Sequence, residues 1–228
     1  MKFDIITIFP KIFDSYFNES ILSRAKKKKL ITIKTHDLRP FAQDKHRMTD
    51  DTPYGGGAGM VMKAEPVLKA VEHIKRQITS KKTKRKVVIL SAKGKQFTQR
   101  EASIWAKKYN QLIFVSGRYE GIDERVKIAL RAEEVSIGPY VLTDGDVAVM
   151  TIISAVSRLI PGVIKLKSLQ EESHGNLILK NEKQSKLEYP HYTKPEIIIW
   201  KGKKYRVPKI LLSGNHKKIK EWRDHKSV

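Results

Sequence analysis

The chain has 228 residues, of which 46 are lysine or arginine and 24 are aspartate or glutamate, giving a formal net charge of +22. This length is enough for one large domain, or for one domain and a smaller second one, and the 40% of hydrophobic residues argues against a wholly disordered chain. The absence of cysteine excludes disulfides, thiolate metal sites and cysteine nucleophiles.

Two features of the sequence bear on where the protein works. The N-terminal run at residues 1–17 contains acidic residues and lacks a small-residue cleavage site, so it does not resemble a signal peptide. No stretch reaches the roughly 18 uncharged apolar residues that a membrane-spanning helix needs. Because a chain without cysteine also suits a reducing compartment, we expect a cytoplasmic protein with no membrane partner.

The positive charge is concentrated in three lysine-rich segments, at residues 24–30, 80–86 and 216–226. A strongly basic chain favours a polyanionic partner, either nucleic acid or a membrane surface. Since no long basic helix carries an aromatic face, nucleic acid is the better match. A general lysine bias of the genome is the alternative explanation, and composition alone leaves it open.

The first third of the chain begins with a strand, a helix and a second strand. Residues 3–9 form an apolar run typical of a buried strand, and helical periodicity extends over residues 10–28. A second strand is predicted at 30–36. The glycine-rich segment TPYGGGAGMVM follows at 52–62, and the next helical pattern covers 63–78.

Three similar strand–loop–helix units come next. The strand at 86–90 ends in SAKGK, and a helix is predicted from Thr98, a plausible N-cap. The strand at 111–115 ends in SGRYEG, and a helix runs through DERVKIAL. The strand at 133–137 ends in GPYVLTDGD, and a helix is predicted over about 147–159.

This alternation predicts an α/β domain with a mostly parallel sheet. Ligands of such sheets bind at the carboxyl ends of the strands. All three of these carboxyl ends carry glycines, and their convergence favours a ligand site there. The glycines are Gly94, Gly117, Gly121, Gly138 and Gly145.

The chain changes character after the PGV at 161–163, where a polar stretch with weak periodicity begins. A loop of about 30 residues is usually functional or disordered in a compact protein. Apolar clusters return near residue 196 and are followed by a short basic helix. We therefore expect a domain at 1–162, a linker at 163–195 and a small second domain at 196–228.

The glycine loops match no common phosphate-binding motif. After Gly59 comes neither the Gly-Lys-Ser of a P-loop nor the third glycine of a dinucleotide-binding loop. Gly94-Lys95 is followed by glutamine instead of serine or threonine. The sequence also lacks HExxH and GxSxG motifs. Such loops would suit a ligand held by backbone hydrogen bonds, for example an adenosine group.

Six motifs occur in order over essentially the whole chain: TPYGGGAGMVMK, SGRYEGIDERV, VSIGPYVLTDGDVAVM, SAVSRLIPGV, LEYPHYTKPE and LLSGNHKKIKEWR. Together they closely resemble the bacterial tRNA (guanine-N1)-methyltransferases, which modify guanine 37 beside the anticodon. The resemblance implies a SPOUT-type α/β fold with a trefoil-knotted first domain and a small, mostly helical C-terminal domain. It also implies a homodimer with active sites at the interface. The substrate would be the anticodon stem-loop of tRNA with guanine at position 36.

The same resemblance implies that S-adenosylmethionine binds among the three loops of the knot. Its contacts would come from Leu90, Ser91, Gly117, Tyr119, Glu120, Gly121, Ser136, Ile137, Gly138, Pro139, Tyr140, Val141 and Leu142. Magnesium is implied as well, although no ligand cluster in the sequence identifies a site. The glycine-rich segment at 52–62 would border the incoming guanine, with Gly59 in the wall of its pocket.

The chemistry requires a base, because guanine N1 carries a proton, and a group that stabilises the charge developing toward O6. By resemblance, Arg158 in SAVSRLIPG matches the family arginine that stabilises this charge. Glu172 falls on the position of the family aspartate that acts as base. Glu171 and His174 are rival bases, and a solvated acidic pair without a catalytic role is the remaining alternative.

Two further departures from the family pattern are Asp144 in place of a usual glycine and Ser154 in place of a usual aspartate. We expect Asp144 to crowd the cofactor loop. With Glu172, these departures motivate a second hypothesis, a catalytically weakened RNA-binding protein on the same fold. A SPOUT enzyme acting on ribose 2′-oxygens is a third, which the whole-chain match disfavours.

Overall fold

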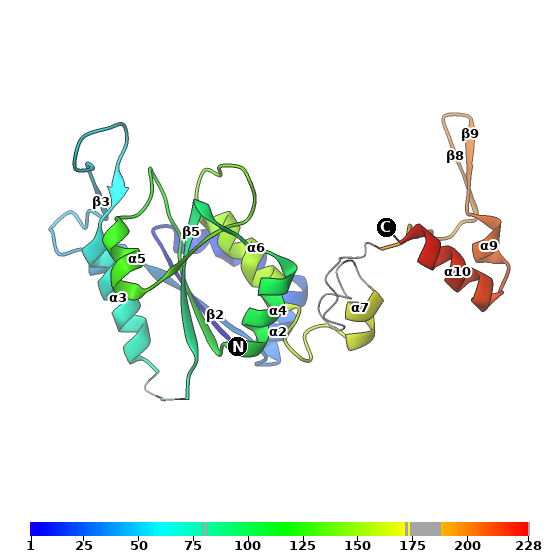
Figure 1. Ribbon diagram of the computed structural model, residues 1–228, viewed down its shortest axis with the longest axis horizontal. Coiled ribbons are helices and arrows are strands. Elements are labelled where there is room, and N and C mark those ends of the chain that lie inside the picture. Colours follow the sequence, from blue (N-terminus) through cyan, green and yellow to red (C-terminus); the bar gives the residue numbers. More distant parts are fainter. Residues whose placement is uncertain (79, 81, 172, 174–187, 228) are drawn as a thin grey trace. The chain divides into compact units, whose positions relative to one another are not determined.

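The computed structural model describes residues 1–228 except 79, 81, 172, 174–187 and 228. The chain forms two compact units, Met1–Ile164 and Lys165–Val228 (Figure 1). Within the described ranges, no helix combines the length and apolar character that crossing a membrane requires. The predicted division into 1–162, 163–195 and 196–228 stays a prediction.

The described residues of the first unit form a five-stranded sheet in the order β2-β1-β6-β5-β7. Every neighbouring pair of strands is parallel, as the alternation of strands and helices predicts. The strands are β1 (Lys2–Thr7), β2 (Thr32–Asp37), β5 (Arg85–Gln96), β6 (Gln111–Val115) and β7 (Glu133–Ser136). The glycine-rich segment is bracketed by a separate small hairpin, β3 (Asp50–Asp51) with β4 (Val61–Met62).

Strand β6 shows why the sheet is covered on both faces. Its sequence is QLIFV, and all five residues are buried. Since successive side chains point to opposite faces, Leu112 and Phe114 join one core cluster, and Ile113 and Val115 join another. Such a run is typical of a central strand in a parallel sheet.

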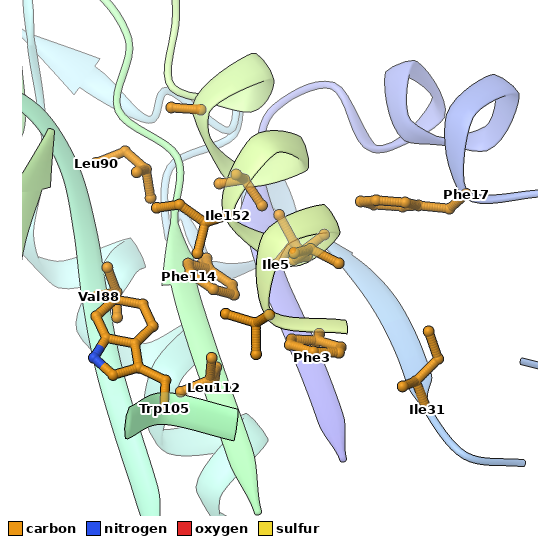
Figure 2. Packing of buried hydrophobic residues seen from close by; sticks show 14 of the residues in the cluster. Phe3, Ile5, Phe17, Ile31, Val88, Leu90, Trp105, Leu112, Phe114 and Ile152 are labelled. Atoms are coloured by element: carbon orange, nitrogen blue, oxygen red, sulfur yellow. The ribbon is translucent and has the colours of Figure 1, made fainter. Parts of the chain in front are cut away.

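Helices supply the other half of each cluster. Trp105 and Ile152 pack with Phe3 on one face of the sheet (Figure 2), whereas Ile74 and Val126 belong to the cluster on the other face. The two faces are thus covered by α4 and α6, and by α3 and α5. The helices of this unit are η1 (Pro10–Phe13), α1 (Asp14–Phe17), α2 (Ser20–Lys27), η2 (Arg39–Phe41), α3 (Ala64–Arg76), α4 (Gln99–Lys108), α5 (Glu124–Leu130) and α6 (Asp146–Ser157).

The predicted N-cap of α4 is confirmed. The backbone N–H of Glu101 donates to Thr98 Oγ1 over 3.3 Å, and the backbone N–H of Thr98 donates to Glu101 Oε2 over 3.2 Å. This reciprocal pair is a capping box, which satisfies two amide groups that the first turn leaves without partners. The sequence TQRE therefore fixes where the helix begins.

The prediction of one continuous helix over residues 10–28 is wrong. The segment is divided into η1, α1 and α2, with a break at Asn18 and Glu19, and Ser20 adopts a φ of +51°. Phe17 and Leu22 are both buried in the same cluster. Residues five apart point to different faces of a continuous helix, so the break lets both side chains reach the core.

The prediction that a loop begins after residue 90 is also wrong, because β5 continues through SAKGK to Gln96. The ladder with β7 shifts register between Leu90 and Lys95. A Cβ added at Gly94 would lie 2.5 Å from the backbone nitrogen of Val135. Gly94 therefore serves the close approach of two strands, and it is not part of a ligand loop.

The second unit contains helices and a hairpin. The helix α7 (Leu166–Glu171) lies in the stretch predicted as a linker. An antiparallel hairpin, which the expectation of a mostly helical domain did not include, is formed by β8 (Ile197–Trp200) and β9 (Lys203–Arg206). It is followed by α9 (Lys209–Leu212) and α10 (His216–Lys226).

Candidate active site

A pocket of about 410 Å³ lies at the edge of the sheet where β6 and β7 end, beside the part of β5 where its register with β7 shifts. These strands are neighbours in the sheet, so their carboxyl ends meet at one edge. The walls come from residues 89–93 in the middle of β5, from residues 117–124 after β6, and from residues 134–137 and 140–145 at the end of β7 and beyond it. The volume falls in the range of small-molecule sites, about 300–1,000 Å³.

The structure brings most of the predicted cofactor residues to this pocket. Eleven of the thirteen line it: Leu90, Ser91, Gly117, Tyr119, Glu120, Gly121, Ser136, Ile137, Tyr140, Val141 and Leu142. Gly138 and Pro139 do not line it. Instead, a Cβ at Gly138 would overlap the ring of Tyr140, so this glycine lets the segment fold back on itself.

The three wall segments come together at Gly145. Its backbone N–H donates to the carbonyl of Gly117 over 2.8 Å. A Cβ at Gly145 would lie 2.8 Å from Gly117 N and 3.1 Å from Leu90 Cβ, and one at Gly117 would lie 3.1 Å from the Leu90 carbonyl oxygen. Glycine is therefore needed for close approach of the segments, and unusual φ angles are not the reason at these two positions.

Arg118 ties the second segment to the third. Its Nη2 lies 3.2 Å from Asp144 Oδ2 and 3.1 Å from Asp146 Oδ2, and its guanidinium stacks over the ring of Phe9, 4.2 Å from the centroid. Asp146 is fully buried and also accepts a hydrogen bond of 2.9 Å from the hydroxyl of Thr7. This network connects the pocket to the end of β1.

Asp144 is engaged by its own backbone surroundings as well as by Arg118. Its Oδ1 accepts hydrogen bonds from the backbone N–H groups of Asp146, over 2.8 Å, and Val147, over 3.4 Å. These are amides of the first turn of α6, which an acidic side chain also stabilises electrostatically. The carboxylate therefore caps a helix that lacks a side-chain cap from Gly145.

A cluster of four charged side chains at the pocket, joined by ion pairs, was not predicted from the sequence. Lys93 Nζ lies 3.3 Å from Glu124 and 3.5 Å from Glu134, and Lys127 Nζ lies 3.2 Å and 2.7 Å from the same carboxylates. Hydrogen bonds from Lys127 and Lys93 hold the pKa of Glu124 below its ordinary value. The four residues come from three separate segments, so no local motif indicates them.

The end of the glycine-rich segment packs on the second wall segment. The backbone N–H of Glu120 donates to the carbonyl of Met60 over 3.0 Å, and the N–H of Met62 donates to the carbonyl of Gly121 over 2.9 Å. Gly59 has a φ of +79°, and a Cβ there would lie 2.6 Å from Glu120 Oε1. Gly59 thus lies directly behind a residue of the pocket.

Tyr119 connects the pocket with β3. It adopts a φ of +58°, and its side chain is about half exposed. Burial, then the negative charge of Asp50 and a hydrogen bond with it, raise the pKa of the Tyr119 hydroxyl. Two acidic residues that directly precede the glycine-rich segment, Asp50 and Asp51, form β3.

The predicted catalytic residues are not assembled at this pocket in the described chain. Arg158 is the C-cap of α6 and does not line the pocket. Glu172 and its rival His174 lie outside the described residues, and Glu171 is the last residue of α7. Ser154 accepts a hydrogen bond of 2.9 Å from the hydroxyl of Tyr16. Among the described side chains, no group of three or more His, Cys, Asp or Glu is arranged to hold a metal ion.

Comparison with known proteins decides the family. The family model described as tRNA (guanine-1)-methyltransferase TrmD matches residues 1–228. The chain belongs to this family. The resemblance of the six motifs is therefore confirmed over the whole chain.

Relatives of this tRNA (guanine-1)-methyltransferase family support the assignment. Three proteins, each named tRNA (guanine-N(1)-)-methyltransferase, are similar to the chain over nearly its full length. The protein of Thermomicrobium roseum is 50% identical over 223 residues, covering 98% of this chain and 77% of the relative. Those of Dehalococcoides mccartyi strain BAV1 and Chloroflexus aggregans are 45% and 48% identical, covering 100% and 98% of this chain and 86% and 81% of the relatives.

Proposed function

We propose that this protein transfers a methyl group from S-adenosylmethionine to N1 of guanine 37 in tRNA, in a G36-G37 context. The observation that carries the proposal is the pocket at one edge of the parallel sheet, walled by β5 and by the ends of β6 and β7, in a chain that belongs to the tRNA (guanine-1)-methyltransferase family. The family supplies the reaction, and the pocket supplies a site of suitable size at the expected edge of the sheet.

The residues of the pocket fit S-adenosylmethionine. When bound, this cofactor supplies an electrophilic methyl group on a sulfonium centre. The apolar side chains of Leu90, Ile137 and Leu142 would hold the adenine, and the backbone at Gly121 lies open to a ligand because no atom is within 4 Å of the place where a Cβ would be. The close contacts at Gly145 keep the three walls at a fixed spacing, which favours a preorganised site.

The chain's own residues must handle a proton and a charge. Glu172 would remove the proton from guanine N1, as the family aspartate does by resemblance, with Glu171 and His174 as rivals. Arg158 would stabilise the negative charge that develops toward O6. Gly59, next to Glu120, would form part of the wall of the guanine pocket.

We further propose the trefoil knot of the SPOUT fold and a homodimer with active sites at the interface. The knot is supported by the third wall segment, which at Gly145 approaches both other segments. The dimer is supported by exposed apolar side chains on elements that pack together, Ile12 and Tyr16 from η1 and α1 and Val147 from α6. Exposed apolar groups of this kind are common at subunit interfaces.

Binding of tRNA would involve both units. The lysine-rich segments would contact phosphates and so position the RNA without reading its sequence. The linker at 163–195 and the C-terminal domain at 196–228 would hold the anticodon stem-loop. Magnesium is proposed as an additional requirement on the strength of the resemblance alone, and we propose that the protein acts in the cytoplasm.

The test is methyl transfer from labelled S-adenosylmethionine to an unmodified tRNA transcript with G36 and G37. We expect transfer by the wild-type protein and its loss in Arg158→Ala. The matched control is Arg76→Ala, which removes an exposed arginine paired with Glu72 and should keep wild-type activity. Glu172→Gln should bind cofactor but lose nearly all turnover. Tight tRNA binding without any transfer would instead favour the weakened RNA-binding protein.

A further inference from the structure

The described residues of the second unit leave the hairpin of β8 and β9 uncovered. Ile197 pairs with Arg206 and Trp200 with Lys203. All eight strand residues are exposed, among them three isoleucines, a tryptophan and a tyrosine. Figure 1 shows the hairpin standing out from α9 and α10. A two-stranded hairpin is at best marginally stable in water. Burying these exposed apolar side chains against a partner would therefore stabilise it.

The turn fixes which side chains share a face. Lys201 and Gly202 have φ values of +50° and +72°. Positive φ at both central residues defines a type I′ turn, whose twist matches that of the strands it joins. A two-residue turn of this type leaves no room for a register slip, which would exchange the two faces.

The two faces differ in chemistry. Because cross-strand partners share a face and consecutive residues alternate, one face carries Ile198, Trp200, Lys203 and Tyr205, and the other carries Ile197, Ile199, Lys204 and Arg206. Trp200 and Tyr205 are diagonal neighbours, close enough for their rings to form one surface. The first face is therefore aromatic, and we call these four residues the aromatic face.

Charge identifies the partner. Residues 197–206 contain four basic side chains, Lys201, Lys203, Lys204 and Arg206, and no acidic one. Aromatic rings next to cations are the means by which proteins bind unpaired bases, since every base has a π-face and every nucleotide a phosphate. A hairpin with aromatic rings but no cations would fit a protein partner better, and one with cations but no aromatic rings would fit a nucleic-acid duplex better.

We propose that the aromatic face of the β8–β9 hairpin stacks on unpaired bases of the tRNA, with Trp200 as the principal contact and Lys203 at a phosphate. The proposal rests on the proposed function for the identity of the RNA. It adds a contribution to tRNA affinity that does not depend on salt, in contrast to the contribution of the lysine-rich segments.

Stacking and ionic contacts leave different signatures. Trp200→Ala should weaken tRNA binding by about 5- to 150-fold, the range for loss of one stacked base. The slope of log Kd against log salt should stay as in the wild type. Lys203→Gln should instead lower that slope by about one. Trp200→Phe keeps a ring and should retain most of the affinity.

The experiment is filter binding of the full chain to an unmodified tRNA transcript, at several salt concentrations and without S-adenosylmethionine. The matched control is Ile199→Ala on the opposite face, because Ile199 and Trp200 are both 66% exposed. We expect this control to stay within about twofold of the wild type. Since no turnover is needed, failure of the methyl-transfer assay leaves this readout intact.

Three results would overturn the proposal. In the first, Trp200→Ala binds tRNA as tightly as Ile199→Ala. In the second, Trp200→Ala changes the oligomeric state on size-exclusion chromatography, which would make the hairpin a protein contact. In the third, Trp200→Ala reduces sedimentation with anionic vesicles and leaves tRNA affinity unchanged, which would make it a membrane contact.

Discussion

Replacing Gly145 with alanine tests the packing that forms the pocket. The added Cβ would lie 2.8 Å from the backbone nitrogen of Gly117 and 3.1 Å from Ser116 Oγ and Leu90 Cβ. The nearest of these atoms belongs to the backbone, so no change of rotamer relieves the contact. To relieve the contact, the backbone at Gly145 and Gly117 must move apart, and this movement would stretch the 2.8 Å hydrogen bond from Gly145 N–H to the Gly117 carbonyl.

The size of the effect follows from these contacts. Overpacking a well-packed site by one methyl group costs about 1–3 kcal/mol. For a chain of this size, each kcal/mol lowers the melting temperature by about 2–4 °C. If about 1.4 kcal/mol falls on the cofactor-bound state, the Kd for S-adenosylmethionine rises about tenfold.

Calorimetric titration with S-adenosylmethionine and thermal melting are the assays. The matched control is Arg76→Ala on the exposed surface of α3, which should change stability by less than about 0.5 kcal/mol. If Gly145→Ala binds the cofactor and melts like the wild type, the close approach of the three segments is not what shapes the pocket.

Three further predictions concern other parts of the first unit. In Gly59→Val, the substituted residue would have to adopt a φ of +79°, and its Cβ would lie 2.6 Å from Glu120 Oε1. We expect methyl transfer to fall about 100-fold while the circular dichroism spectrum stays unchanged. Wild-type turnover would contradict this prediction. Arg118→Lys removes the planar guanidinium that lies over the Phe9 ring while its Nη2 contacts Asp144 and Asp146. This substitution should lower the free energy of unfolding in urea by about 1–3 kcal/mol, and an unchanged midpoint would refute the prediction. Burial raises the pKa of the Asp4 carboxyl, but hydrogen bonds from its neighbours and the charge of Lys2 outweigh burial and hold this pKa below the ordinary value. A depressed pKa stabilises the fold above the unfolded pKa of about 3.9, so Asp4→Asn should be less stable at pH 7, and the difference should shrink as the pH falls through the folded pKa; a constant difference from pH 7 to pH 2 would count against this reading.

Local rules predicted the parts of the fold that local sequence determines. QLIFV matches β6 in both bounds because a run of buried apolar residues between polar ones has few other solutions in an alternating α/β chain. The N-cap at Thr98 followed from a residue type and a spacing that place two hydrogen bonds. The edge of the sheet at which the pocket lies could be predicted because ligands of parallel α/β sheets bind at the carboxyl ends of the strands.

Tertiary packing decided the rest. The break between Phe17 and Leu22 allows both side chains to reach the core. Within residues 10–28, the helical periodicity is a stronger signal than any residue at the break, so the sequence alone predicts a continuous helix. The extension of β5 past Leu90 depends on β7, which comes some 40 residues later. The pairing of Lys93 and Lys127 with Glu134 likewise joins segments that only the folded sheet brings together.

The position of the transferred methyl group separates the proposed reaction from its alternatives. A G36-G37 tRNA transcript would be incubated with protein and S-adenosylmethionine, digested by nucleases, and mapped by mass spectrometry. We predict 1-methylguanosine at position 37 with the wild-type protein and none with Arg158→Ala. A methyl group on another base atom or on a ribose oxygen, or tRNA that is bound and left unmodified, would contradict it.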